Sequence, residues 1–253
     1  MKHNQITFFS TVPGIAETFP IKEAKDVLPG WLQTARLEYM KGDKRDQTVV
    51  RCPGIVDILT TGYIISTWHD FDINIDKDGK VYFLAPDEKI TKMLVDKESL
   101  QMQNGDGMAK HLPKRPWSHP NILKINTPWN VVAPKGLKFL VIPLPYSEFL
   151  NFESNTGILD PGYSTELNIQ GYLNLGPGNH SFKAGTPIAQ LIPLSEESYK
   201  VVVRDMNDED KRWYSKRNWL SLFSFIYHRN KVKEAYDRHV DESTKKCPFH
   251  FWK

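Results

Sequence analysis

The sequence has little cysteine, because Cys52 and Cys247 are its only two. Two cysteines cannot form a disulfide framework, so a small disulfide-stapled scaffold is excluded and a reduced, intracellular setting is expected, with one disulfide left open. Long apolar runs are also missing: none reaches the roughly 18 residues of a membrane span, and the first residues lack the apolar region of a signal peptide. We therefore expect no membrane partner and a location in the cytoplasm.

A strong excess of charge of one sign is absent as well. The sequence has 33 Lys and Arg against 30 Asp and Glu, and 33 − 30 leaves a net charge of +3. This balance is too weak to favour nucleic acid as a partner. In contrast, 40% of the 253 residues are hydrophobic and 12% are aromatic. A chain of this size and composition can bury a sizeable core, so global disorder is excluded.

Glycine and proline together number 15 + 17 = 32, and most of them precede residue 194. They separate short runs of β-branched and aromatic residues, a pattern that is typical of β-rich domains. After Leu194 the pattern changes, and the stretch 212–239 has neither Pro nor Gly. Asn207 precedes three acidic residues and is an expected helix N-cap. The sequence therefore predicts a β-rich domain over 1–194 and a mostly helical segment, packed on it, over 195–253.

Several local elements are predicted more closely. Residues 70–84 alternate polar and apolar side chains around an Asp-Gly turn, which indicates a β-hairpin. Residues 31–38 are expected to form two helical turns. Strands are expected at 47–51 and 55–59, and a short helix is expected at 86–95.

One segment carries functional information. Residues 157–167 read G-I-L-D-P-G-Y-S-T-E-L, and residues 182–192 read F-K-A-G-T-P-I-A-Q-L-I. In this order and spacing they resemble the hairpin and the following strand of the dUTPase and dCTP deaminase family. The resemblance covers about residues 122–194. It implies a compact β-barrel or β-sandwich with jelly-roll-like architecture, so the expected fold class is mainly β with a C-terminal helical extension.

The same resemblance assigns roles to four residues. Asp160 takes the position of the general base, since a carboxylate held in a rigid turn can deprotonate a water. Tyr163 takes the position of the aromatic ring under the deoxyribose. Ser147 and Gln190 take the positions of polar contacts beside the site. An enzyme of this kind would use Mg²⁺, with a nucleotide as its ligand.

Three departures from the family pattern argue against that activity. The arginine expected beside Ser147 is absent, and Glu148 follows instead, which would repel a phosphate. The position of the deaminases' catalytic Glu is occupied by Gln170, which cannot exchange protons as an acid or a base. The family glycine after the aromatic residue is Thr165. We therefore expect a non-catalytic β-domain protein without a cofactor, with a dUTPase-like nucleotide hydrolase as the alternative.

The whole chain also resembles an uncharacterised family of tailed-phage and bacterial proteins, through Cys52-Pro53, the G-I-L-D element and the G-T-P-I-A-Q-L-I-P element that ends at Pro193. This resemblance implies a phage-encoded protein, with association with the virion left open, and no known activity. The absent arginine and glutamate, together with three aromatic residues in the last five, favour a role in ligand binding or protein assembly, with a protein partner or a homo-oligomer.

Three possible metal sites each lack a residue or a spacing that the site would require. The stretch from Asn74 to Asp78 matches the first half of a calcium loop, but Ala85 stands where a bidentate Glu is required. The two cysteines with His69 or His250 could supply zinc ligands, but the sequence lacks the paired spacing that zinc sites show. An iron site of H-x-D type would need an Asp two residues after His69, where the sequence has Phe. No metal site is therefore predicted.

Overall fold

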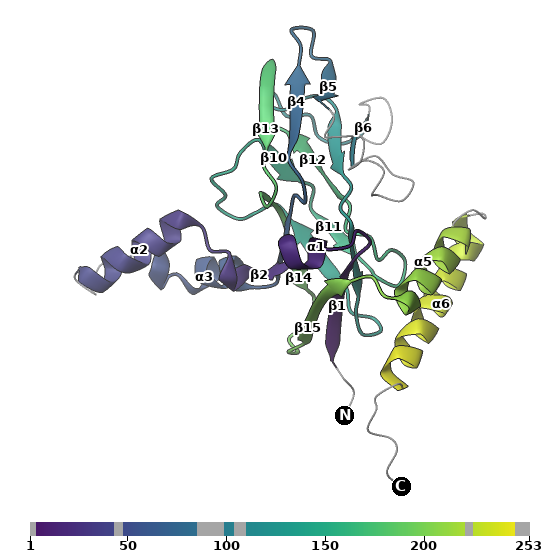
Figure 1. Ribbon diagram of the computed structural model, residues 1–253. Helices are drawn as coiled ribbons and strands as arrows, with labels where there is room; N and C mark the ends of the chain where they lie inside the picture. Colours follow the sequence, from purple (N-terminus) through teal and green to yellow (C-terminus); the bar gives the residue numbers. More distant parts are fainter. Residues whose placement is uncertain (1–3, 43–47, 85–98, 104–109, 221–224, 246–253) are drawn as a thin grey trace.

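The computed structural model describes residues 4–42, 48–84, 99–103, 110–220 and 225–245, and Figure 1 shows their arrangement. The prediction of a mainly β protein is confirmed. Four sheets are present in the described chain: β15-β1-β8, β10-β12-β7-β6, β11-β9-β14-β3-β2 and β13-β4-β5. These sheets keep separate edges, so the described strands do not close into a single barrel.

The strands are β1 (Gln5–Ser10), β2 (Lys22–Glu23), β3 (Tyr63–Ser66), β4 (Phe71–Ile75), β5 (Val81–Leu84), β6 (Leu100–Gln103), β7 (Ile122–Ile125), β8 (Trp129–Val132), β9 (Phe139–Ile142), β10 (Phe152–Ser154), β11 (Gly157–Leu159), β12 (Ile169–Leu173), β13 (Gly178–Phe182), β14 (Pro187–Pro193) and β15 (Lys200–Asp205). The α-helices are α1 (Ile15–Thr18), α2 (Gly30–Lys41), α3 (Pro53–Thr60), α5 (Asp208–Leu220) and α6 (Phe225–Lys245), with short 3-10 turns η1 (Ala24–Asp26) and η2 (Val49–Arg51).

A shared apolar core joins the four sheets. Phe8, Leu123, Phe139 and Phe182 come from one sheet each, and all four belong to the same cluster with at most 1% of their surface exposed. Burying aromatic and branched side chains of this size stabilises the fold by roughly 1.5–3 kcal/mol for each residue. The β body is therefore a single packed unit, against which the helices are placed.

The hairpin predicted for residues 70–84 is confirmed as β4 and β5, with Asp72 to Ile75 paired to Val81 to Leu84. Asp76 closes its turn, because its Oδ1 accepts the backbone N–H groups of Asp78 and Lys80 at 3.0 and 2.8 Å. These hydrogen bonds lower the pKa of Asp76, with that from Lys80 contributing most. The carboxylate considered as a calcium ligand thus serves the turn.

The strands expected at 47–51 and 55–59 are wrong where they are described. Val49–Arg51 is a 3-10 turn, and Pro53–Thr60 is helix α3. Proline at the first position of a helix has the required φ and loses no hydrogen bond, so Pro53 starts α3 instead of interrupting a strand. The helix expected at 86–95 lies outside the described residues.

The C-terminal segment first contributes a strand and then two helices. β15 pairs in parallel with β1, from Gln5 with Lys200 to Ser10 with Asp205. The predicted N-cap is confirmed, since Asn207 Oδ1 accepts the N–H groups of Glu209 and Asp210 at 3.0 and 2.9 Å. None of the helices in the described chain is both long and apolar enough to cross a membrane.

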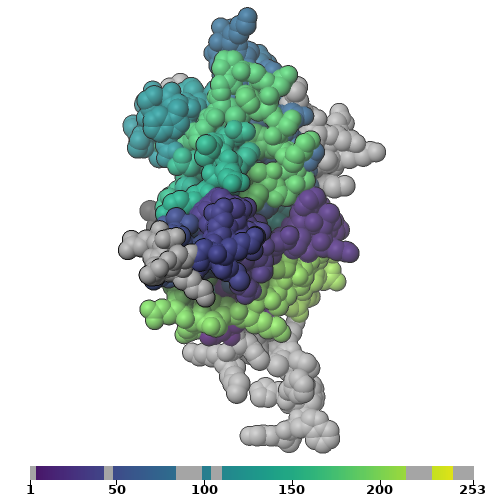
Figure 2. Space-filling model, turned by 90° about the vertical axis from the view of Figure 1, so that its left-hand side faces the viewer, coloured from purple at the N-terminus to yellow at the C-terminus, as the bar shows by residue number. Residues whose placement is uncertain are grey.

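The helix predicted near residues 31–38 is confirmed and is longer, as α2. It projects from the side of the β body in Figure 1, and in Figure 2 it faces the viewer over the middle of that side. Leu32 is its only buried residue, whereas Leu37 and Met40 are 58% and 73% exposed. We call α2 the arm.

Candidate functional site

The Asp160 turn is the place where the sequence predicts chemistry. Asp160 follows the last residue of β11, and its side chain is 15% exposed. Its Oδ1 accepts the N–H of Gly162 at 3.0 Å, and its carbonyl accepts the N–H groups of Tyr163 and Ser164 at 2.9 and 3.0 Å. An aspartate that binds its own backbone two residues on stabilises a turn. Half of this carboxylate is therefore engaged in shaping the loop.

The other carboxylate oxygen of Asp160 faces a cation. Leu159 pairs with Phe139 across β11 and β9, so Lys138, the residue just before β9, lies opposite Asp160. The ammonium of Lys138 is 3.9 Å from Asp160 Oδ2, and the lysine side chain is 50% exposed. An ion pair of this length with an exposed lysine contributes at most about 1 kcal/mol to stability.

Helix α6 lies over the same turn. The ammonium of Lys233 is 5.3 Å from the centre of the Tyr163 ring, within the range of a cation–π contact. A Cβ added to Gly162 would lie 3.6 Å from Lys233 Cγ, so the aliphatic part of the lysine packs directly on the turn. One face of the ring assigned to a sugar thus already has a partner within the chain.

Tyr236 anchors α6 beside this turn. Its hydroxyl donates to the carbonyl of Ala133 at 2.9 Å and accepts the N–H of Ala133 at 2.8 Å. Burial raises the pKa of Tyr236 well above its usual range, the backbone bond to Ala133 opposes this, and the negative charges of Asp160 and Asp237 add to the increase. The tyrosine stays neutral and holds α6 against the chain that follows β8.

Further contacts secure the helical segment. Lys135 pairs with Asp241 of α6 at 2.6 Å. Trp213 of α5 packs edge-on against Tyr236 of α6 and stacks on His239 with the ring centres 5.4 Å apart, and Val132 of β8 packs against this cluster. The helices therefore bind this end of the β body through both apolar and polar contacts.

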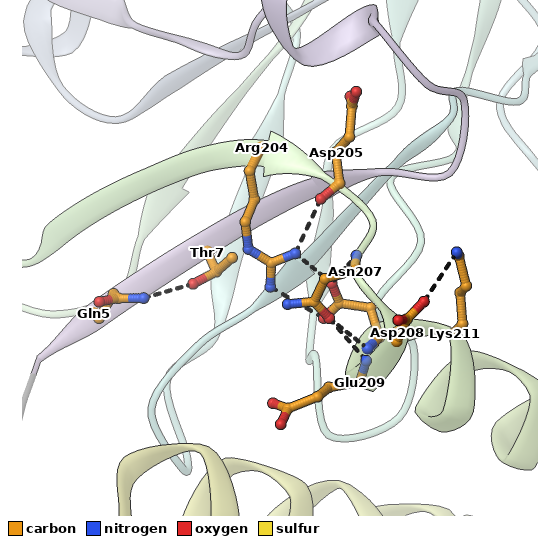
Figure 3. A network of polar contacts seen from close by, with 9 residues as sticks. Gln5, Thr7, Arg204, Asp205, Asn207, Asp208, Glu209 and Lys211 are labelled. Carbon is orange, nitrogen blue, oxygen red and sulfur yellow. Dashed lines mark hydrogen bonds and ion pairs between the residues drawn. The ribbon is translucent and has the colours of Figure 1, made fainter. Parts of the chain in front are cut away.

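Figure 3 shows the polar network where α5 begins. Arg204, at the end of β15, forms an ion pair with Asp210, whose side chain is only 3% exposed. Asp210 also accepts the N–H of Asn207 at 2.9 Å. An ion pair with a nearly buried carboxylate needs such additional hydrogen bonds to offset the desolvation of its charges. This network explains why the chain turns from strand into helix at this point.

Gln190 and Ser147 do not join the Asp160 turn. Gln190 is 1% exposed, and its Nε2 donates to the carbonyls of Ile58 and Thr61 at 2.7 and 2.6 Å, which ties α3 to β14. Ser147 Oγ accepts the N–H of Phe149 at 3.0 Å within the loop after β9. Since β9 and β11 are antiparallel, this loop and Asp160 follow opposite ends of the pair. The structure thus brings together only Asp160 and Tyr163 of the four predicted site residues.

Thr165, which stands where the dUTPase and dCTP deaminase family has a glycine, has a structural role. Its side chain is fully buried, and its hydroxyl donates to Asn130 Oδ1 at 2.9 Å. The neighbouring backbone completes this contact, because the N–H of Val131 donates to the carbonyl of Thr165 at 2.7 Å. A glycine would leave the buried Asn130 oxygen without this donor.

The residues considered as metal ligands are dispersed. Cys52 is exposed at the start of α3, while Cys247 and His250 lie outside the described residues. His69 is buried, which lowers its pKa, and its Nδ1 donates to the carbonyl of Asp70 at 2.7 Å. Within the described ranges, no three His, Cys, Asp or Glu side chains form a group that could hold a metal ion.

Sequence reasoning missed the role of Lys233 and Tyr236. The helical spacing of the C-terminal segment indicated a packed helix, but no motif linked it to residue 160.

Sequence reasoning also missed an apolar surface on the third sheet, β11-β9-β14-β3-β2. Residues that are paired across neighbouring strands share a face, and the pairs of Leu140 with Ile158 and with Ile192 define one such face.

We call this surface the outer face. It comprises Leu140, Ile142, Ile158, Ile192 and Leu194. All five are at least partly exposed, with Ile158 at 58% and Leu194 at 50%, whereas Phe139 and Leu191 on the opposite side of the same strands are fully buried. The Gln190 contact places α3 at one border of this face. Branched apolar side chains in one continuous group on a sheet are typical of an interaction surface.

Neither a protein-family model nor a curated protein matches the chain. Among solved structures, it is similar to the native dUTPase of EIAV, with a TM-score of 0.32 and 14% sequence identity. The match covers 78% of this chain and 94% of that one. This is a weak resemblance at the level of the fold.

Proposed function

We propose that this chain is a non-catalytic β-domain protein that acts in assembly with a protein partner. The observation that carries the proposal is the state of the Asp160 turn. Asp160 closes its own turn, and Lys233 of α6 covers one face of the Tyr163 ring, the ring that the family resemblance assigns to a sugar. The two predicted polar contacts support the fold elsewhere, because Gln190 holds α3 and Ser147 closes its own loop.

Assembly is favoured over ligand binding by where the chain leaves apolar surface. The arm exposes Leu37 and Met40, and the outer face exposes Ile158 and Leu194. Apolar side chains that gather on a projecting helix and on a sheet face are better suited to another protein surface than to a small polar ligand, which binds in a concave site.

A nucleotide hydrolase is the second candidate, with Asp160 as general base and Mg²⁺ as cofactor. One contact favours it: the ammonium of Lys138 lies 3.9 Å from Asp160 Oδ2, so a cation is present beside the carboxylate. In this alternative, Lys138 would compensate for the phosphate-binding arginine that the sequence lacks.

A hydrolysis assay with dUTP or dCTP and Mg²⁺ separates the two candidates. We expect no turnover and no thermal shift, either with the natural chain or with Lys233→Ala, which uncovers the Tyr163 ring. Turnover that Asp160→Asn abolishes would overturn the proposal. The asparagine still accepts the Gly162 N–H, so this variant tests the proton chemistry with the turn intact. Asp160→Ala is the matched control for the turn, and we expect it to lower stability by about 1 kcal/mol.

A further inference from the structure

We propose that the arm of one copy of this chain packs on the outer face of a second copy, which returns the same contact with its own arm. This inference rests on the proposed role in assembly and names the partner. The arm starts beside the outer face, because Trp31 Nε1 donates to the carbonyl of Tyr146, four residues after β9 ends, at 3.1 Å. From there it projects away from the β body (Figure 1).

The two surfaces match in size. The arm has 12 residues, which corresponds to a helix roughly 18 Å long and about 10 Å wide. The outer face crosses β11, β9 and β14, whose axes span about 10 Å from the first strand to the third. A helix laid along β9 would therefore cover the apolar side chains of all three strands.

Area favours a second copy over an unrelated helix. One arm on one face would bury roughly 400 Å² in total, whereas a stable interface needs at least about 1,000 Å². Two copies related by a twofold axis make the contact twice and bury roughly 800 Å². This area falls below that requirement, within the range of weak, transient complexes. The exchange should therefore give a weak dimer that depends on concentration.

The charges at the borders also fit an exchange. The arm carries one anion, Glu38, and two cations, Arg36 and Lys41, beside its apolar residues. The outer face is bordered by a cation just before β9, Lys138, and by an exposed anion in the loop after β9, Glu148. Each surface thus offers both signs, so charges of opposite sign can pair across the contact.

The test is sedimentation analysis of the full chain from about 1 to 300 µM, where a dimer of this interface size should appear. Met40→Lys on the arm and Ile158→Lys on the outer face each place a charge in the contact. We expect either to weaken dimerisation about tenfold or more. Trp117→Lys is the matched control, because Trp117 is 68% exposed in the loop before β7, on a different sheet.

Mixing the two variants sharpens the test. A Met40→Lys copy keeps an intact face and an Ile158→Lys copy keeps an intact arm, so the mixture restores one of the two contacts. We expect the mixed dimer to be more stable than either variant dimer alone. A monomer at every concentration, or a dimer that survives both substitutions, would overturn the inference. Neither result involves nucleotide turnover, the readout whose appearance would overturn the non-catalytic role.

Discussion

Helices α6 and α2 are both attached to the β body, but they use their apolar residues differently. Helix α6 buries Val232, Ala235 and Tyr236, and Lys233 of the same helix covers the Asp160 turn. The arm α2 buries only Leu32 and leaves Leu37 exposed near its end. The polar anchors differ in position: α6 is bonded to Ala133 and Lys135 through Tyr236 and Asp241, well along the helix, whereas Trp31 at the start of α2 donates to Tyr146. The comparison suggests that α6 completes the fold, whereas α2 is available to something outside it.

The largest effect should come from removing the anchor of α6. Tyr236→Ala deletes a buried ring and leaves the backbone groups of Ala133 without their partner. We expect a loss of about 3–5 kcal/mol in the free energy of unfolding, measured by urea denaturation. Tyr236→Phe keeps the ring and removes only the hydroxyl, so it should cost about 1–3 kcal/mol. A loss below about 1 kcal/mol for both variants would show that α6 contributes little to the fold and would remove the contrast with α2.

The stability at high pH tests the same anchor, because ionisation of Tyr236 would place a negative charge in the buried site. Burial raises the pKa of Tyr63 to about 12 and also raises that of Tyr236. Both pKa values are higher in the folded state, so the stability they contribute is fully present below the unfolded value of about 10 and is lost as pH rises through the folded value. We expect stability to be level from about pH 7 to 9 and to fall by about 1–2 kcal/mol per tyrosine towards pH 12.

The measurement is the urea midpoint against pH, followed together with tyrosinate absorbance. Tyr63→Phe and Tyr236→Phe should each flatten the decline at high pH, because phenylalanine carries no ionisable group. Tyr82→Phe, at a side chain that is 41% exposed, is the control for the removal of one phenol from the absorbance signal. A decline that persists in the Tyr63 and Tyr236 double variant would assign it to other groups.

The sequence predicted the parts of this fold that local pattern determines. Alternation and the Asp-Gly turn gave the β4–β5 hairpin, and Asn207 gave the start of α5. The same patterns misled at α3, where a short run of Ile and Val is compatible with either a strand or a helix and Pro53 decided for the helix. A short apolar run alone therefore does not fix the type of element.

The candidate site was predictable only in part, because its remaining contacts depend on strand register and helix placement. Asp160 and Tyr163 are three residues apart in one turn, so their proximity follows from the motif. The approach of Lys138 depends on the pairing of β9 with β11, and the approach of Lys233 depends on where α6 packs. Ser147 follows β9 and Asp160 follows β11, and because these two strands are antiparallel, the two residues lie at opposite ends of the pair. Resemblance to a family motif carried none of this information.

The smallest effect on stability should come from the arm. Leu37 and Met40 are exposed in the single chain, so the double variant Leu37→Ser, Met40→Ser removes little buried area. We expect the urea midpoint of the monomer at low concentration to change by less than about 0.5 kcal/mol, while association at high concentration is lost. Leu32→Ser, at the one buried position of the arm, is the matched control and should cost about 2–4 kcal/mol. If the double variant destabilises the monomer as strongly as Leu32→Ser does, the arm packs on its own chain and the contrast with α6 disappears.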